Sequence, residues 1–156
     1  MFTHFDEKGQ AKMVDITDKP LTERVAITEG IVRMKPETLK MILNKEIAKG
    51  DVFQVARLAG IMAAKMTPLL IPLCHPLPIT SVEIDFEPDE KNSLVKIKTT
   101  VKTKAQTGVE MEAMVATSLA ALTVYDMCKA VDKEIVVEQI KLIYKAGGKS
   151  GEFIRI

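Results

Sequence analysis

Asp126 and Lys129 are the pair of residues in this sequence that most strongly suggests catalysis. They lie three positions apart in a predicted helix, so their side chains share one face and can touch. A pair at this spacing is ordinarily a surface salt bridge. Here it follows a run of apolar residues, and a buried ion pair gives little net stability after desolvation. We therefore interpret both residues as catalytic, with Lys129 able to exchange protons where burial disfavours its charged form.

A second candidate group lies in the proline-rich stretch LLIPLCHPLPIT, residues 69–80. Its three prolines prevent a helix from continuing and predict an extended apolar connection. Adjacent side chains of an extended segment point to opposite faces, which disfavours a Cys74–His75 nucleophilic dyad. His75 can contact a substrate and shuttle protons, whereas Cys74 fits packing or a backbone contact. A buried thiol beside a core histidine is the alternative interpretation.

Two acids, Glu110 and Glu112, stand at the start of a long predicted helix. Acids in a first turn complement the positive end of the helix dipole. The free backbone N–H groups at the same place can bind a polar ligand. These uses are compatible, and we expect Glu112 to hydrogen-bond a substrate.

Basic residues that could bind an anionic substrate are scattered along the chain. Each of them alone is ordinarily a solvated surface charge. The GGKS string at 147–150 is not the end of a nucleotide-binding P-loop, because Ile143 occupies the position of the required glycine. That string instead fits a tail that folds over a bound ligand. The candidates for anion binding are Arg24, Lys49, Lys65 and Lys145.

Composition narrows the class of protein. The chain has 156 residues, 47% of them hydrophobic and 28% charged, which is typical of a single folded domain. A formal net charge of +1 gives no global field that favours nucleic acid or an anionic membrane. Two cysteines and two histidines favour neither a disulfide framework nor a metal site. The sequence has no signal-like or membrane-spanning apolar run, so we expect a cytoplasmic protein.

The elements that position these residues follow from hydrophobic periodicity. Residues 24–34 alternate with period two and predict a strand, in which Gly30 fits a bulge. Pro36 opens a helix that Gly50 ends, and a second helix follows that stops before Pro68. The remaining predicted elements are a hairpin (81–87 and 93–103), a long helix (108–131) and a strand (134–148).

The order strand-helix-helix-strand-strand-helix-strand predicts one α+β domain over residues 1–156. We expect a ferredoxin-like antiparallel sheet with helices packed on one face. Residues 1–23 are expected to be irregular, and residues 146–156 to form a flexible glycine-rich tail.

The long predicted helix is almost wholly apolar after Glu112, which implies burial on most sides and, in a small domain, a subunit interface. Glu112 and Asp126 are fourteen positions apart, about 21 Å along a helix that rises about 1.5 Å per residue. One small pocket in one chain cannot easily hold both. Either the site combines opposite helix ends of two subunits, or one of the two does not contact the substrate; we prefer the composite site.

Six uncommon strings together resemble the MoaC family over nearly the whole chain, in order and spacing. The resemblance implies a lyase of molybdenum cofactor biosynthesis. Its reaction converts (8S)-3′,8-cyclo-7,8-dihydroguanosine 5′-triphosphate into cyclic pyranopterin monophosphate with release of pyrophosphate. The strings are MVDITDK (13–19), KGDV (49–52), IPLCHPLP (71–78), QTGVEMEA (106–113), LTVYDMCKAV (122–131) and KAGGKSGEF (145–153).

The resemblance also implies roles for individual residues. Asp126 and Lys129 match the family's catalytic residues, and we group Lys49 with them. A homohexamer built from dimers is implied, with a small-molecule substrate, no nucleic acid and no required cofactor. Mg²⁺ is expected only as a counterion of the phosphates. The expected substrate-binding residues are Leu73, Cys74, His75, Glu110, Met111, Glu112, Lys145 and Arg24.

Two other functions are compatible with a fold of this class, because a fold does not imply a function. One is a non-catalytic domain that binds a small regulatory ligand, and the charged pair Asp126 and Lys129 argues against it. The other is a structural assembly subunit, which would explain the apolar helix but neither Cys74–Pro76 nor the GVEME string at 108–112.

Overall fold

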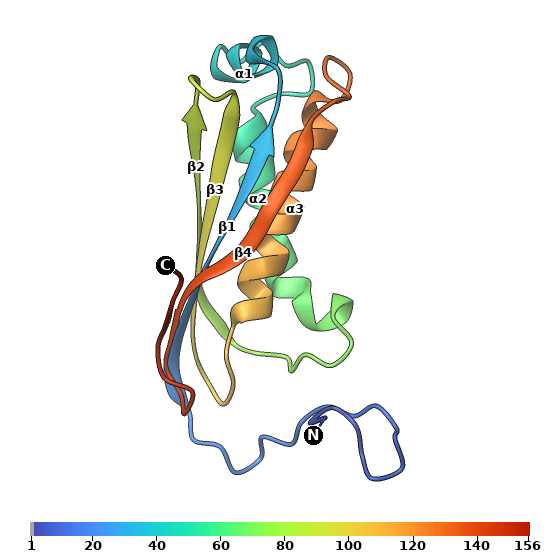
Figure 1. The fold of residues 1–156 in the computed structure, drawn as a ribbon, viewed down its shortest axis with the longest axis vertical. Helices are drawn as coiled ribbons and strands as arrows, with labels where there is room; N and C mark the ends of the chain where they lie inside the picture. Colours follow the sequence, from blue (N-terminus) through green and yellow to red (C-terminus); the bar gives the residue numbers. More distant parts are fainter. Residues whose placement is uncertain (1) are drawn as a thin grey trace.

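The computed structural model of the chain describes residues 2–156 and shows a five-stranded antiparallel sheet with helices on one face (Figure 1). The strand order across the sheet is β2-β3-β1-β4-β5. This is the ferredoxin-like α+β fold that the sequence predicted, with one further strand at the C-terminus. In chain order the elements are β1 (Thr22–Arg33), α1 (Pro36–Leu43), α2 (Val52–Leu70), β2 (Ile79–Asp89), β3 (Leu94–Ala105), α3 (Glu110–Cys128), β4 (Val136–Ala146) and β5 (Phe153–Ile154).

Strand β1 lies in the middle of the sheet, between β3 and β4. It pairs with β3 along its whole length without a register shift. The period-two alternation turns Ala26, Thr28 and Val32 toward the helices, where all three are fully buried. The predicted strand at 24–34 is therefore confirmed, and it forms the surface on which the helices pack.

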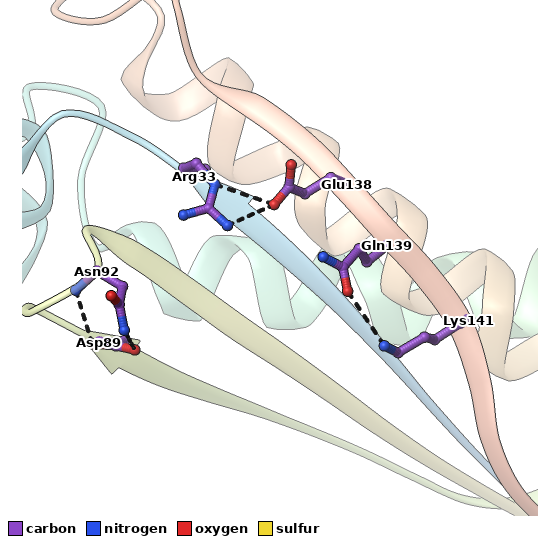
Figure 2. Close-up of polar contacts among 6 residues, drawn as sticks. All are labelled: Arg33, Asp89, Asn92, Glu138, Gln139 and Lys141. Carbon is purple, nitrogen blue, oxygen red and sulfur yellow. Dashed lines mark hydrogen bonds and ion pairs between the residues drawn. The ribbon is translucent and has the colours of Figure 1, made fainter. Parts of the chain in front are cut away.

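A bulge was expected at Gly30, but the irregularity lies in the neighbouring strand, β4. Between Glu29 and Ile31 the pairing of β1 with β4 shifts register, so that β4 contains the extra residue. Gln139 in this part of β4 has a positive φ of 55°. Figure 2 shows this part of β4. Lys141 Nζ donates a hydrogen bond to Gln139 Oε1, and the Arg33 guanidinium donates two to Glu138 Oε1. Gly30 faces the bulge and does not form it.

Gly30 is required by the close approach of α3 to the sheet. A Cβ atom at this position would lie 2.6 Å from Ile140 Cδ1 and 2.8 Å from Thr117 Cγ2. Gly60 in α2 has a similar role, since a Cβ there would lie 3.0 Å from the carbonyl oxygen of Ala116 in α3. The absence of a side chain at these two positions thus lets α3 approach both the sheet and α2 closely.

Helices α2 and α3 pack side by side on the same face of the sheet (Figure 1). The buried side of α3 is rich in alanine, including Ala113, Ala116, Ala120 and Ala121, all fully buried. Its apolar character therefore has an explanation within one chain. The expected burial of the long helix on most sides is seen, and α2 and the sheet supply it.

Several large apolar side chains that remain exposed lie together on the outer side of α2. Their spacing of three or four residues places them along one helix face. An exposed apolar face of this kind is typical of a protein contact surface. Among residues 2–156, no helix combines the length and apolarity needed to cross a membrane. The exposed side chains on α2 are Val55, Leu58, Met62, Met66, Leu69 and Leu70.

Two helix ends differ from the predictions. Helix α1 ends at Leu43 and not beside Gly50, because Lys45 adopts a positive φ of 57° and the chain continues in turns. Helix α2 continues through Pro68 to Leu70. A proline in the last turn removes a single backbone hydrogen bond, and packing against α3 and β2 outweighs that loss.

The C-terminal segment contains a strand that the sequence analysis missed. Phe153 and Ile154 form β5, which pairs with Lys145 and Tyr144 of β4. Gly147 and Gly148 have φ of 103° and 79°, so they can make the turn between the two strands. At the other end of the chain, the irregular segment predicted before β1 contains only an isolated bridge between Phe5 and Ala11 among its described residues.

A row of three buried threonine hydroxyls joins α3 to the sheet. Thr117 Oγ1 of α3 lies 2.8 Å from Thr99 Oγ1 of β3 and 2.7 Å from Thr28 Oγ1 of β1. Thr28 also donates to the Ala113 carbonyl oxygen over 2.8 Å. All three hydroxyls are shielded from water, so each needs a partner within the protein.

Thr117→Val is therefore expected to destabilise the fold by about 1–3 kcal/mol, because it leaves Thr99 and Thr28 short of a partner. The matched control is Thr123→Val on the same helix, where the hydroxyl bonds only to the Leu119 carbonyl oxygen. Urea unfolding of both variants measures the difference. Equal stability of the two variants would show that the threonine row contributes nothing specific.

Candidate active site

A cavity of about 390 Å³ lies where α3 begins. Three segments that are distant in sequence meet there: the N-terminal segment, the connection from α2 to β2, and the loop from β3 to α3 (Figure 1). Six of the predicted substrate-binding residues line it: Leu73, Cys74, His75, Glu110, Met111 and Glu112. We call this hollow the α3-start cavity.

The connection from α2 to β2 forms one wall of the cavity. Cys74 donates its backbone N–H to the Ile71 carbonyl oxygen over 3.2 Å, which makes a tight turn at the end of α2. His75 Nε2 lies 2.6 Å from the carbonyl oxygen of Val14, so the histidine holds the N-terminal segment against this wall. After this turn, residues 74–78 of the connection form neither helix nor strand, as its prolines predicted, whereas Leu69 and Leu70, expected to be extended, lie in the last turn of α2.

The Cys74 thiol is poorly suited to nucleophilic attack. Burial raises the pKa of Cys74, and the nearby Glu112 and Glu110 raise that pKa further. A thiol in such surroundings keeps its proton at neutral pH, whereas a nucleophilic cysteine needs its thiolate. The geometry therefore favours packing or a substrate contact for Cys74.

Glu112 is the most buried charged group of the cavity, with 2% of the residue exposed. Burial raises the pKa of its carboxyl, its own backbone N–H opposes the rise, and Glu110 adds to it. A buried carboxyl at the edge of a polar cavity is well placed to hydrogen-bond a ligand that carries N–H groups. Glu110 is less buried, and its Oε1 lies 3.8 Å from Lys145 Nζ.

Three of the basic residues predicted to bind phosphates lie at separate places on the molecule. Lys145 lies beside the α3-start cavity, because its Nζ forms an ion pair with Glu110, one of the residues that line the cavity. The same Nζ donates to Ser150 Oγ over 3.1 Å. Arg24 lines a separate hollow of about 550 Å³, where it donates to the carbonyl oxygens of Ala105 and Gln106. Lys65 lines a third hollow, of about 280 Å³.

The predicted catalytic residues form a second group at the far end of α3. Asp126 Oδ1 lies 3.0 Å from Lys129 Nζ, and Asp126 Oδ2 lies 3.1 Å from Lys49 Nζ. Lys49 also donates to the Asp126 carbonyl oxygen over 3.0 Å. Hydrogen bonds from Lys129 and then Lys49 lower the pKa of the Asp126 carboxyl, so it is a carboxylate at neutral pH. We call these residues the Lys49–Asp126–Lys129 cluster.

The cluster is exposed and not embedded in apolar surroundings as the sequence analysis assumed. The side chains of Asp126 and Lys129 are 55% and 51% exposed in the single chain. The helix face that carries them projects beyond the core. Only a substrate or another subunit could therefore desolvate Lys129. Salt bridges as exposed as these add little to stability by themselves.

The two groups of residues are separated by the length of α3. The helix comprises 19 residues, with Glu112 in its first turn and Asp126 in its last. At about 1.5 Å per residue the two carboxyls are about 21 Å apart along the helix axis. The structure thus brings six predicted substrate-binding residues together at one end of α3 and the predicted catalytic residues together at the other, while Arg24 lies in a separate hollow. It does not bring one group to the other within a chain.

Some residues of the cavity were missed as candidates. Lys19, Thr107 and Gly108 line it together with His4 and Ile16. Lys19 was within reach of sequence reasoning, because it ends the MVDITDK string and provides a positive charge. Within the part of the chain that the structure describes, no three His, Cys, Asp or Glu side chains gather in a way that could hold a metal ion.

The raised pKa of Glu112 predicts a pH-dependent effect on stability. A carboxyl with a higher pKa in the folded than in the unfolded chain stabilises the fold below the ordinary pKa of glutamate, and this contribution is lost as the pH rises through the folded pKa. Glu112→Gln cannot ionise. It is expected to raise the Tm near about pH 7, with a gain that shrinks toward about pH 4.

Calorimetric unfolding across this pH range measures the effect, with Glu90→Gln on the exposed β2–β3 turn as the control. A Tm difference that stays constant with pH would contradict the assignment of a raised pKa to Glu112.

Known proteins match the chain across both groups of residues. The model of the MoaC family matches residues 13–148. A protein of Dinoroseobacter shibae is 61% identical over 151 residues, covering 97% of this chain and 96% of its own length. A protein of Magnetococcus marinus is 58% identical over 153 residues, covering 98% and 94%.

A protein of Pelotomaculum thermopropionicum is 56% identical over 153 residues, covering 98% of this chain and 90% of its own length. All three relatives carry the name cyclic pyranopterin monophosphate synthase. With a family match over most of its length and relatives at this level of identity, the chain belongs to the MoaC family.

Proposed function

We propose that this chain is a lyase that converts (8S)-3′,8-cyclo-7,8-dihydroguanosine 5′-triphosphate into cyclic pyranopterin monophosphate and pyrophosphate, in molybdenum cofactor biosynthesis. The observation that carries the proposal is the α3-start cavity, with the buried Glu112 beside Leu73–His75, in a member of this family. A small polar cavity that contains one buried carboxyl fits the amino-pyrimidine end of such a substrate.

The chemistry divides into binding and proton transfer. In this proposal Glu112, Met111 and His75 hold the base-derived part of the substrate, and Lys145 beside them neutralises the triphosphate. Arg24, which lines a separate hollow, contributes to this neutralisation if the triphosphate extends out of the cavity. Closing the cyclic phosphate forms a bond from a sugar-derived hydroxyl oxygen to the α-phosphorus. It breaks the bond from that phosphorus to the β-phosphate oxygen, so pyrophosphate leaves with the electron pair. The proton of the hydroxyl must pass to a base.

The Lys49–Asp126–Lys129 cluster supplies groups for these steps. The carboxylate of Asp126 can accept a proton, and the two ammonium groups within about 3 Å of it can donate protons or stabilise developing charge on the phosphates. No bound cofactor enters this scheme. A Mg²⁺ ion would act only as a counterion of the substrate's phosphates, and the proposed place of action is the cytoplasm.

We propose further that each site is shared by two subunits of an even-numbered oligomer, a hexamer built from dimers. Two observations support this. The binding and catalytic groups lie about 21 Å apart along α3, which exceeds the reach of one small cavity. The exposed apolar face of α2, from Val55 to Leu70, provides a surface for subunit contact.

Asp126→Asn and Lys129→Ala are expected to lower kcat at least on the order of a hundredfold while leaving the oligomer intact, because each removes a group that transfers protons or stabilises charge. Turnover is measured from pyrophosphate release and from formation of a fluorescent pterin. Lys40→Ala, an exposed lysine of α1, is the matched control. Near-normal turnover in either cluster variant would remove that residue from the catalytic assignment, and a wild-type protein without product would refute the proposed reaction.

The shared site predicts complementation between two inactive variants. Glu112→Ala and Asp126→Ala should each be nearly inactive alone, and should regain activity when co-expressed. In random dimers half the pairs are mixed and each mixed pair has one intact site of two, so about a quarter of wild-type activity is the ceiling. Mass spectrometry of the intact oligomers confirms mixing. Mixed, folded oligomers that stay inactive would mean that each site is built within one chain.

A further inference from the structure

Asp132 is a buried carboxylate that belongs neither to the α3-start cavity nor to the Lys49–Asp126–Lys129 cluster. It is 2% exposed and lies in the turn that follows α3. Its Oδ2 accepts the backbone N–H of Lys35 over 3.0 Å and the hydroxyl of Thr38 over 2.9 Å. Its Oδ1 accepts the backbone N–H of Glu134 over 3.0 Å.

These donors keep Asp132 charged in spite of its burial. Burial acts to raise the pKa of the carboxyl, but the hydrogen bonds from Lys35, Thr38 and Glu134 outweigh it and lower the pKa overall. A charged group in the interior is retained where its hydrogen bonds are complete. Removing it would leave three donors without their partner.

Asp132 serves as a cap for a helix that is distant in sequence. The N-cap residue of α1 is Lys35, whose own side chain makes no capping hydrogen bond. Asp132, 97 positions further along the chain, accepts the N–H of this N-cap residue. A carboxylate at a helix N-terminus also interacts favourably with the helix dipole. The start of α1 is therefore fixed by the turn after α3.

The main chain of Asp132 is fixed to the end of α3. Its backbone N–H donates to the Cys128 carbonyl oxygen over 3.0 Å, as does the N–H of Val131. Cys128 is 1% exposed, so this last turn is anchored in the core. The carboxylate thus moves with α3, the helix that carries Asp126 and ends just before Lys129.

Lys49 belongs to the segment that α1 leads into. Residues 44–50 continue from α1 in turns, with hydrogen bonds from Glu46 N–H to Met41 O and from Gly50 N–H to Ile47 O. The buried residues of α1 itself are only Thr38, Leu39 and Ile42. Ile47 in the turns that follow α1 adds a fourth buried side chain. With so few buried anchors, the orientation of this unit depends in part on its polar attachment to the rest of the fold.

We propose that Asp132 is a positioning residue: by tying the start of α1 to the end of α3, it holds Lys49 beside Asp126 and Lys129. The catalytic part of this inference rests on the proposed function of the cluster, whereas its geometric part does not. Asp132 follows Asp126 by six positions in the sequence, and it acts on Lys49 through the backbone of α1. It touches none of the three cluster side chains through any hydrogen bond seen among residues 2–156.

The kinetic test uses the full-length protein. Asp132→Ala is expected to lower kcat on the order of tenfold to a hundredfold with little change in KM, because a displacement of about 1 Å is enough for a loss of that size. Thr38→Val removes one of the three donors and should shift kcat in the same direction by a smaller factor, and Thr38→Ser should restore it. Asp89→Asn is the matched control. That carboxylate accepts two hydrogen bonds from Asn92 in the β2–β3 turn (Figure 2), and among the described residues it makes none to α1 or to the cluster.

A second measurement does not depend on activity. The pKa of the Asp126 carboxyl, followed by ¹³C NMR of aspartate-labelled protein and assigned with Asp126→Asn, is held low by Lys129 and Lys49. Displacement of Lys49 in Asp132→Ala should raise this pKa, and Lys49→Ala should raise it by a similar amount. Asp89→Asn should leave it unchanged.

The outcomes separate the two proposals. A folded Asp132→Ala protein with normal kcat and an unshifted Asp126 pKa would overturn the positioning role and leave Asp132 a purely structural cap. If Asp132→Ala fails to fold, Thr38→Val and Thr38→Ser decide by the same two measurements. If the wild-type protein makes no pterin product, the proposed function fails, and the NMR titration still decides whether Asp132 positions Lys49.

Discussion

The close contact between α3 and the middle of the sheet is the constraint on which the rest of the structure depends. Gly30 has no side chain because Thr117 and Ile140 occupy the space that a Cβ would need. The hydroxyl of Thr117 bonds into the sheet at the same level. A helix held this closely cannot slide or rotate without breaking buried contacts. Both ends of α3 are therefore fixed points, and each end carries one group of site residues.

The carboxyls of Glu112 and Asp126, at the two ends of α3, have pKa values shifted in opposite directions by their surroundings. Glu112 lies beneath the cavity wall, where burial raises the pKa of its carboxyl. Asp126 is open to solvent, and the ammonium groups of Lys129 and Lys49 lower its pKa. Glu112 is thus suited to bind a ligand through hydrogen bonds, whereas Asp126 stays ionised and holds two ammonium groups beside it. The structure keeps these tasks about 21 Å apart along one helix.

Much of the fold could be predicted because each element has a clear periodicity. The alternation in β1 and in the β2–β3 hairpin, and the apolar run of α3, gave the correct sheet and helices. The errors fall where local signals were weak or overruled. Lys45 ended α1 early, tertiary packing carried α2 through Pro68, and β5 is too short to show an alternation. Gly30 was correctly identified as an unusual position in its strand. The reason for the glycine is that Ile140 of β4 and Thr117 of α3 fill the space that a side chain would need.

The sequence by itself determined which residues have the chemistry of the site, because Asp126 and Lys129 share a helix face and Leu73–His75 and Glu110–Glu112 are contiguous strings. Only the tertiary structure decided which of these residues meet. It brought Lys49 to Asp126 and placed the N-terminal segment, with Lys19, against His75. It also showed that the charged pair of α3 is exposed, and that Asp132 joins two helices from a turn that has no motif of its own. Contacts across such sequence distances depend on how whole elements pack, and local periodicity does not encode that packing.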